Sequence, residues 1–404
     1  MNFNTVPLST LCKGGGSYGI AASAVEYSAE LPTYLRITDI NDDGTLNESG
    51  LKSVDDTNSG KYYLSPNDIV FARTGASTGR NYFFDGTDGD FVYAGFLIKF
   101  SIDPQKVNPQ FIKYYCQSKD YNDWIASFNT GSTRGNINAV TLGNMPIPVV
   151  EREQQNLIVE TLSSLDTQIA NNAKINHHLE QMAQAIFKSW FVDFEPWGGI
   201  MPDDWREGTI SDLGDVIGGS TPSKAKPEYF TEQGIAWITP KDLSVNKSKF
   251  ITRGADDITE LGFRNSSARL MPRGTILFSS RAPIGYIAVA SGEVCTNQGF
   301  KSVVPKANVG TAFIYYFLIQ NLETIENMAS GSTFKEISGS TMKGIPAVIP
   351  DNETLRRFQK ECTPIFEKQE LLEAENAHLA DLRDALLPRL MSGELSVSDL
   401  GTAK

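Results

Sequence analysis

The chain has 404 residues and a formal net charge of −12, from 36 basic and 48 acidic side chains. This length predicts two or three compact units, and the 40% hydrophobic share is typical of a globular protein. No apolar run long enough for a membrane span and no secretory signal are evident, so we expect a cytoplasmic protein without a membrane partner. The negative charge argues against a chain that wraps nucleic acid by itself.

In chain order, the first predicted unit is a mixed α+β globule over residues 1–150. Its β-branched and aromatic runs predict strands at 34–37, 69–71 and 91–100, with a helix near 109–127 and a closing strand at 145–150. A helix over 151–195 and a linker over 196–203 follow. The second globule covers 204–350, with strands at 235–238, 275–278 and 345–350 and a helix near 312–329. A second long helix over 351–392 and a tail over 393–404 complete the chain.

The two long segments carry the heptad pattern of a coiled coil, with steps of four and three between seam positions. The seam residues of the first are Leu165, Ile169, Asn176, Leu179 and Ile186, and those of the second are Ile365, Leu372, Asn376, Leu379 and Leu386. Asn176 and Asn376 coincide at a spacing of 200, where a polar residue can fix the register. Pro364 predicts a kink or break, because it lacks an amide hydrogen.

The chain contains an internal sequence repeat. Gly131-Ser132-Thr133 recurs as Gly331-Ser332-Thr333, and Ile69-Val70-Phe71 matches Ile276-Leu277-Phe278. The order is kept while the spacing drifts, as loop insertions between two divergent copies would produce. We therefore expect a pseudo-two-fold repeat in which the two long helices pair antiparallel and place a globule at each end. In the alternative, each helix packs only on its own globule.

Residues with catalytic or metal-binding chemistry are scattered. There is no P-loop, dinucleotide fingerprint, nucleophile elbow or metal-ligand spacing, so we predict no catalytic residue and no metal. Widely spaced cysteines predict reduced thiols. These residues are Cys12, Cys116, Cys295 and Cys362, with His177, His178 and His378 in the helical segments.

Gly/Ser/Thr-rich loops carry isolated basic or amide side chains at matching places in both copies. Small hydroxyls suit phosphate contacts, and Arg, Asn and Gln side chains suit base edges in the major groove. Each loop could also be an ordinary turn. The candidates for DNA contact are Lys13, Ser17, Tyr18, Arg73, Thr74, Ser77, Arg80, Ser132, Arg134, Asn136, Ser220, Thr221, Ser223, Lys224, Lys241, Ser280, Arg281, Asn297, Gln298, Ser332 and Lys335.

An aromatic cluster closes the first long helix. It is formed by Trp190, Phe191, Phe194 and Trp197. The cluster is either core, where helix meets globule, or a surface on which a partner docks.

Several motifs together resemble the specificity subunit of type I restriction–modification systems. They are Phe187-Lys-Ser-Trp-Phe-Val-Asp-Phe-Glu-Pro196, Leu382-Arg-Asp-Ala-Leu-Leu-Pro-Arg-Leu-Met-Ser-Gly-Glu394, Gly218-Gly-Ser-Thr-Pro-Ser223 and Trp237-Ile-Thr-Pro-Lys-Asp-Leu243. Gly15-Gly-Ser-Tyr-Gly19 and Tyr34-Leu-Arg-Ile-Thr-Asp39 look like a different member of the same target-recognition domain group. Gln369 and Arg383 depart from the apolar seam.

The resemblance implies a non-catalytic subunit whose two target-recognition domains each read one half of an asymmetric, interrupted site in double-stranded DNA. It further implies two methyltransferase subunits that carry S-adenosylmethionine and modify adenine, and motor-nuclease subunits that use ATP and Mg²⁺. We expect no cofactor in this chain. A scaffold with two binding globules on a coiled-coil spacer, without a role in DNA recognition, remains the rival hypothesis.

Overall fold

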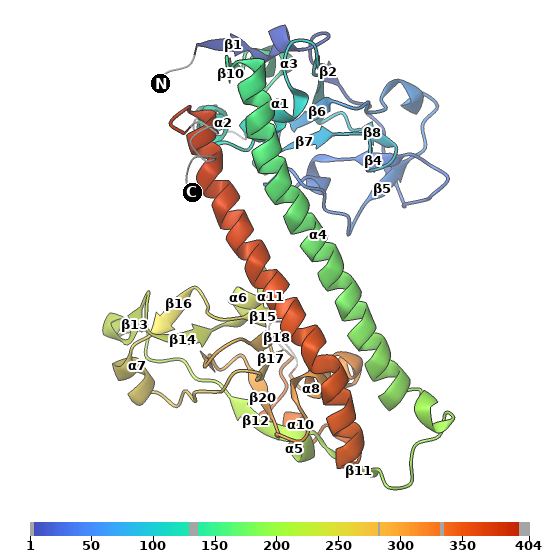
Figure 1. Ribbon diagram of the computed structural model, residues 1–404, viewed down its shortest axis with the longest axis vertical. Coiled ribbons are helices and arrows are strands. Elements are labelled where there is room, and N and C mark those ends of the chain that lie inside the picture. The colour runs from blue at the N-terminus through green and yellow to red at the C-terminus, as the bar shows by residue number, and fades with distance from the viewer. Residues whose placement is uncertain (1–3, 129–135, 282, 332–334, 396–404) are drawn as a thin grey trace. The chain divides into compact units, whose positions relative to one another are not determined.

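The computed structural model describes residues 4–128, 136–281, 283–331 and 335–395 (Figure 1). The chain forms two compact units. The first unit comprises residues 1–168 and 378–404, and the second comprises residues 169–377. Each unit thus includes part of both long helices. The sequence had instead predicted globules that are separate from the two long helices. The reason is that the apolar faces of both helices complete the cores of the globules.

In its described residues, the first unit contains two four-stranded sheets and a two-stranded ribbon. The sheets have the orders β2-β9-β6-β7 and β3-β5-β4-β8, and β1 pairs with β10. All pairs are antiparallel except β4–β8. The strands are β1 (Thr5–Pro7), β2 (Ser17–Tyr18), β3 (Ala24–Val25), β4 (Thr33–Leu35), β5 (Lys52–Val54), β6 (Asp68–Ala72), β7 (Asn81–Phe84), β8 (Phe91–Tyr93), β9 (Leu97–Ser101) and β10 (Pro146–Pro148).

The helices of the first unit are short. They are α1 (Pro109–Tyr115), α2 (Lys119–Ala126), α3 (Ala139–Gly143) and the 3-10 helices η1 (Leu8–Leu11), η2 (Ile37–Asp39), η3 (Ser59–Lys61) and η4 (Gly75–Ser77). The single helix predicted at 109–127 is wrong, because Ser118 caps a new helix. Its hydroxyl accepts the Tyr121 N–H at 3.3 Å. The strand predicted at 91–100 is likewise two strands, with a turn at 94–96.

The second unit repeats this topology. Its sheets have the orders β12-β20-β17-β18-β15 and β13-β16-β14-β19, and β11 pairs with β21. Again one pair of the smaller sheet, β14–β19, is parallel, and β15 adds a parallel edge to β18. The strands are β11 (Arg206–Thr209), β12 (Gly214–Gly218), β13 (Phe230–Thr231), β14 (Ile235–Ile238), β15 (Phe250–Ile251), β16 (Asp256–Ile258), β17 (Ile276–Ser280), β18 (Ile284–Ala290), β19 (Cys295–Thr296), β20 (Lys301–Pro305) and β21 (Pro346–Ile349).

The second unit also contains short helices. They are η5 (Glu195–Trp197), α5 (Ile210–Leu213), η6 (Pro227–Tyr229), α6 (Pro240–Val245), α7 (Glu260–Arg264), α8 (Thr311–Gln320), α9 (Leu322–Asn327) and α10 (Gly339–Lys343). Helix α8 lies beside the second long helix in Figure 1. Its buried Phe313 and Tyr316 pack with Phe358 and Phe366 of that helix. The predicted helix at 312–329 is therefore α8 followed by α9.

The long helices are α4 (Arg152–Phe191) and α11 (Asn352–Met391), each of 40 residues. At about 1.5 Å per residue, each is about 60 Å long. Ile158 and Leu162 of α4 join the core of the first unit, and Ala183 and Phe187 join that of the second. The alternative in which each helix packs only on its own globule is therefore wrong.

The contacts between the helices show that they run antiparallel. In the first unit, Arg383 pairs with Asp166 at 3.1 Å. In the second unit, the Asn376 amide donates to the Ile169 carbonyl at 3.1 Å, and the rings of Phe358 and Phe187 lie 5.9 Å apart. Rising numbers in one helix thus meet falling numbers in the other. The predicted fold class, two homologous mixed α/β globules with an antiparallel helix pair, is confirmed.

The break expected at Pro364 does not occur, because α11 continues through it. The proline removes one donor and leaves the Lys360 carbonyl without its helical partner. Both Pro364 and Lys360 are exposed, so water can satisfy this carbonyl. The hydroxyl of Thr363 also donates to the Gln359 carbonyl at 2.7 Å. One missing hydrogen bond at the surface is therefore tolerated.

Candidate nucleic-acid interface

A glycine in the first unit brings the end of β2 onto the turn between β8 and β9. A Cβ atom at Gly19 would overlap the carbonyl oxygens of Tyr93 and Ala94, so only glycine fits there. The next residue, Ile20, donates its N–H to the Tyr93 carbonyl at 3.0 Å. The Tyr34 hydroxyl from β4 donates to the Ile20 carbonyl at 2.9 Å. These contacts join the two sheets of the unit at this loop.

The second unit repeats these contacts with different side chains. A Cβ atom at Gly219 would overlap the Asn297 and Thr296 carbonyl oxygens. Ser220 donates its N–H to the Thr296 carbonyl at 2.8 Å, and the Trp237 indole N–H from β14 donates to the Ser220 carbonyl at 3.0 Å. We call this repeated arrangement, centred on Gly19 or Gly219, the loop scaffold.

A second pair of backbone contacts fixes which residues correspond on the loop scaffold. Arg73 donates its N–H to the Phe96 carbonyl at 3.1 Å, and its own carbonyl accepts the Ile137 N–H at 2.9 Å. Ser280 donates its N–H to the Gly299 carbonyl at 2.7 Å and accepts from Ile337 at 3.0 Å. Arg73 therefore corresponds to Ser280, and Phe96 corresponds to Gly299.

On the first unit's loop scaffold, one arginine lies against two exposed aromatic rings. The Arg73 guanidinium is 5.3 Å from the Tyr18 ring centroid and 5.8 Å from that of Phe96. Its Nη1 donates to Asn136 Oδ1 at 3.5 Å, and its Nε donates to the Gly95 carbonyl at 3.4 Å. The Tyr18 hydroxyl accepts the Ala139 N–H at 3.2 Å, which holds the ring. Three of the predicted residues, Tyr18, Arg73 and Asn136, therefore meet at one place.

At the corresponding place in the second unit, small and ion-paired residues replace this cluster. Ser280 is fully buried, and its hydroxyl donates to the Gly299 carbonyl at 3.1 Å. Its predicted DNA contact is corrected here, because its hydroxyl supports the loop and does not reach the surface. Arg281 Nη1 and Lys301 Nζ lie 3.6 and 3.5 Å from the Glu336 carboxylate.

The other candidates of the second unit lie on neighbouring loops. The Thr221 hydroxyl donates to Gln298 Oε1, and Asn297 Oδ1 accepts the Gly299 N–H at 2.8 Å. These contacts bring two predicted loops together. The exposed candidates are Ser223, Lys224, Lys241, Gln298 and Lys335. Ser332 lies outside the described residues.

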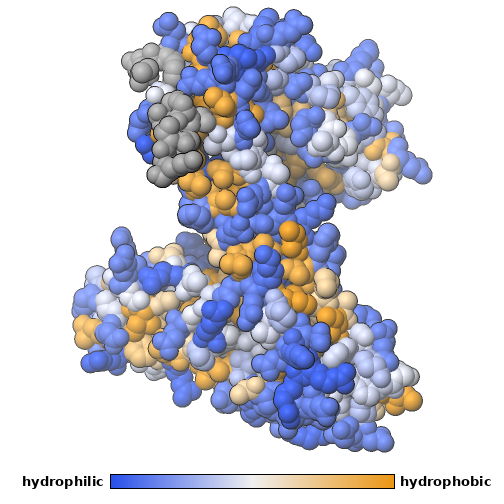
Figure 2. All heavy atoms as spheres, in the orientation of Figure 1, coloured by the Kyte–Doolittle hydropathy of each residue, from blue (hydrophilic) through white to orange (hydrophobic). Residues whose placement is uncertain are grey.

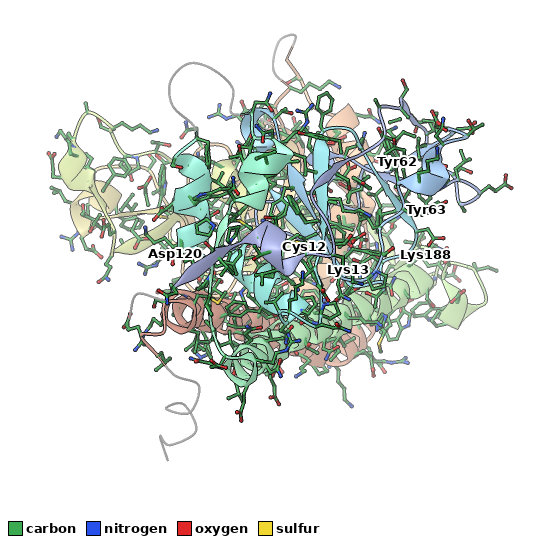
Figure 3. All side chains as sticks on the ribbon, turned by 90° about the horizontal axis from the view of Figure 1, so that it is seen from above. Cys12, Lys13, Tyr62, Tyr63, Asp120 and Lys188 are labelled. Atoms are coloured by element: carbon green, nitrogen blue, oxygen red, sulfur yellow. The ribbon has the colours of Figure 1, made fainter. Side chains whose placement is uncertain are left out.

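The remaining candidates of the first unit are dispersed. Lys13 is exposed beside the buried Cys12, and Figure 3 labels both. The Ser17 hydroxyl bonds the Tyr93 hydroxyl at 2.9 Å. Arg80 is paired with Asp42 at 2.6 Å and lines a separate cavity of about 580 Å³. The half-buried candidates Thr74 and Ser77 flank and end η4, and Ser132 and Arg134 lie outside the described residues.

Sequence reasoning missed Phe96, Lys301 and Glu336. Phe96, 57% exposed, follows Gly95 in the turn at 94–96. That turn was hidden because 91–100 reads as one apolar run. The available signal was the glycine in the middle of the run, which marks a turn or bulge in a strand pattern.

The predicted seam residues of both long helices are buried or half-buried. They are Leu165, Ile169, Asn176, Leu179, Ile186, Ile365, Leu372, Asn376, Leu379 and Leu386. The two asparagines bond across the helix pair and not to each other. Asn176 Nδ2 donates to Glu373 at 3.2 Å, and Asn376 donates to the Ile169 carbonyl.

The aromatic cluster packs with the core of the second unit. Phe191 lies 4.9 Å from Phe313, centroid to centroid, and Trp197 and Phe194 lie 5.0 and 5.9 Å from Trp205. Trp190 lies 6.0 Å from Phe358. All four members of the predicted cluster are half-buried. These contacts favour the core interpretation, while docking of a partner stays a prediction.

The second unit also holds a buried lysine between β15 and both long helices. Lys249 Nζ donates to Glu180 Oε2 at 2.7 Å and to Gln369 Oε1 at 2.9 Å, 3.6 Å from the Phe366 ring centroid. Glu373 accepts the backbone N–H of Lys249 at 3.0 Å. Burial lowers the pKa of Lys249 to about 8, although Glu180 opposes the shift. Gln369, which departs from the apolar seam, therefore accepts a hydrogen bond from this ammonium.

Side chains with metal-binding or nucleophilic chemistry do not gather in the described ranges. No group of three His, Cys, Asp or Glu residues there could hold a metal, and no described helix is long and apolar enough to cross a membrane. All four cysteines are free and buried, and burial raises the pKa of Cys12, Cys295 and Cys362 to about 12. Burial therefore favours the protonated, weakly nucleophilic form of these thiols.

Comparison with known proteins decides the family. The family model described as the type I restriction modification DNA specificity domain matches residues 31–181 and 202–380. The chain is a member of this specificity family. The two matches follow the internal repeat, one on each copy.

Individual relatives of this specificity family member agree. The MjaIX specificity subunit of Methanocaldococcus jannaschii is 41% identical over 172 residues, which cover 42% of this chain and 40% of that protein. The HindI specificity subunit of Haemophilus influenzae is 26% identical over 407 aligned positions, covering 83% and 88%. The crystal structure of the type I S subunit from M. genitalium has the same fold, with 19% identity, a TM-score of 0.61 and 96% of each chain covered.

Proposed function

We propose that this specificity subunit is the DNA-recognition component of a type I restriction–modification complex. Each globule reads one half of an asymmetric bipartite site. The observation that carries the proposal is the loop scaffold, in which the two units make corresponding hydrogen bonds. The side chains mounted on it differ, with Arg73 and Phe96 in one unit and Ser280 and Gly299 in the other. The same backbone arrangement thus places different side chains at corresponding positions of the two units, as the reading of two different base sequences requires.

The second part of the proposal concerns partners. Met182 and Leu382 occupy matching positions of the repeat, and they are 55% and 39% exposed. Apolar side chains exposed twice at matching positions suit one partner that binds twice. The face shown in Figure 2 intersperses apolar and hydrophilic residues. We infer that the helices dock two methyltransferase subunits.

The chemistry of the complex belongs to the partners in this proposal. The subunit itself is not catalytic and needs no cofactor. S-adenosylmethionine belongs to the methyltransferase subunits, and ATP and Mg²⁺ belong to motor-nuclease subunits. The complex works in the cytoplasm, where reduced, buried thiols such as those of Cys12 and Cys362 persist.

The charge distribution supports recognition inside a complex. Residues 151–200 carry three basic and seven acidic side chains, and residues 351–404 carry seven and eleven. These helical segments therefore hold eight of the twelve net negative charges, while residues 201–350 are neutral overall. Since phosphate neutralisation provides most non-specific affinity, we expect the isolated subunit to bind DNA weakly. Tight, strongly salt-dependent binding by the subunit alone would contradict this.

The decisive test is to map methylated adenines in DNA from cells that express the subunit with its methyltransferase partner. We expect one new bipartite motif with two unlike halves. A matched culture that expresses the methyltransferase without this subunit is the control. The scaffold hypothesis without DNA recognition predicts no new motif in either culture, and that result would overturn the proposal.

A further inference from the structure

Arg73, on the first unit's loop scaffold, differs in its partners from most of the described arginines of the unit. Arg36, Arg80, Arg383 and Arg389 each pair with a carboxylate. The contacts that the described residues make with Arg73 are instead with neutral groups, namely two rings, an amide oxygen and a carbonyl. Arg73 thus has no carboxylate partner among the described residues, and the rings beside it are among the most exposed aromatics of the unit.

The geometry of the cluster restricts the guanidinium before any ligand arrives. Tyr18 and Phe96 lie within about 6 Å of it, the range of a cation–π contact. Long, weak hydrogen bonds to Asn136 and Gly95 define its orientation without using its full donor capacity. An arginine held in this way loses little side-chain entropy on binding.

Guanidinium groups make two kinds of contact with DNA. A phosphate accepts the point charge of lysine as readily as arginine, whereas the adjacent O6 and N7 of guanine are matched best by the two parallel donors of a planar guanidinium. A fork fixed against two rings is suited to the second task, because its plane is defined. We propose that Arg73 reads a guanine in the half-site recognised by the first unit. This inference rests on the proposed function and deepens it.

Phe96 and Tyr18 are positioning residues in this proposal. Phe96 contributes an exposed ring and no hydrogen-bonding group, so its replacement removes support without removing a donor. The corresponding residue of the second unit is Gly299, beside Ser280. The second half-site is therefore read without this device, and it serves as an internal reference.

The experiment compares methylation motifs produced by complexes with wild-type subunit, Arg73→Ala, Arg73→Lys and Phe96→Ala. We expect one guanine of the first half-site to become degenerate in both arginine variants, with discrimination falling about 10- to 100-fold. Phe96→Ala should lower discrimination at the same position by less. The second half-site should stay intact, which also reports that the complex assembles. Lys119→Ala, which removes an exposed positive charge of the same unit, is the matched control and should leave the motif unchanged.

Arg73→Lys separates the possible outcomes. A motif that keeps every base while methylation falls uniformly would mean a phosphate contact and would overturn the proposal. An unchanged motif and rate would also overturn it. Should Arg73→Ala fail to assemble, the lysine variant alone decides, because it keeps the charge and removes only the fork. If the wild-type complex produces no bipartite motif, the proposed function fails instead, and the two failures are distinguishable.

Discussion

Lys249 is the residue at which folding and charge are most closely linked. Its ammonium lies beside Glu180 of α4, while Glu373 of α11 holds its backbone. Tyr316 of α8 and Cys362 of α11 also face it. Burial disfavours the charged lysine and raises the pKa of Glu373. The site ties a β-strand edge to both long helices, and truncation of one partner would leave the others buried without compensation.

The depressed pKa of Lys249 predicts a pH dependence of stability. Between pH 8 and pH 10.5, the unfolded chain binds a proton that the folded chain lacks, so this residue makes stability rise with pH. Lys249→Met removes that contribution. The Tm of wild type minus the Tm of Lys249→Met should therefore become more positive from pH 8 to pH 9.5. A constant difference across this range would contradict the assignment.

At the residue scale, folding brings together some of the residues that the sequence nominated for DNA contact and buries or pairs others, while contact with DNA stays a prediction. Tyr18, Arg73 and Asn136 carry groups that suit DNA, and folding brings them together. Ser280 carries a suitable hydroxyl, yet it is buried by the loop scaffold. Arg80 carries a suitable guanidinium, yet Asp42 pairs with it from 38 residues away. Such long-range partners leave no mark in a local pattern.

At the scale of the elements, the two long helices are matching copies of the repeat, but the ion pair between them is not repeated. Asp166 of α4 faces Arg383 of α11 and accepts the Tyr114 hydroxyl at 2.7 Å. At the matching positions of the repeat stand Phe366 and Ala183, both buried. Two copies of α4 would set Asp166 against Ala183, and two copies of α11 would set Arg383 against Phe366. Either combination strands a charge, so the sequence favours pairing of α4 with α11.

Replacement of Asp166 by alanine should destabilise the protein by about 1–3 kcal/mol, because Arg383 and the Tyr114 hydroxyl both lose an acceptor. A double-mutant cycle with Arg383→Ala should give a coupling of about 1 kcal/mol, since both side chains remain partly exposed. Chemical denaturation of the four proteins provides the measurement. Lys188→Ala breaks an exposed pair with Asp193 and should change little. If Asp166→Ala and Lys188→Ala destabilise the protein equally, the Asp166–Arg383 pair cannot be what favours pairing of α4 with α11.

The elements themselves were largely predictable, and the errors share a cause. β-Branched and aromatic runs located β6 and β14, and heptad spacing located α4 and α11, each to within a few residues. The splits between α1 and α2 and between β8 and β9 were missed, because Ser118 and Gly95 sit inside otherwise continuous patterns. At Pro364 the local rule was too strong, since exposure allows water to replace the lost bond.

For the whole molecule, the shared helices connect recognition to geometry. Each helix contributes to both units, so its length is the natural determinant of the gap between the half-sites. Successive half-sites on one face of DNA lie about 34–36 Å apart. We predict that one extra heptad within 166–179, with its match in 366–379, lengthens the spacer of the methylated motif and leaves both half-sites unchanged. An unaltered spacer in the methylation map would exclude this role for the helices.

The loop scaffold has a consequence for how such a protein can diversify. Its bonds are made by backbone atoms, by a glycine and by an inward-facing Tyr34 or Trp237, none of which needs to change when the outer side chains do. Arg73 and Phe96 lie outside these bonds, whereas a Cβ atom at Gly19 or Gly219 would collide with backbone carbonyls whatever the target sequence. A new DNA target then needs only substitutions of outer side chains, while the backbone that carries them keeps its bonds.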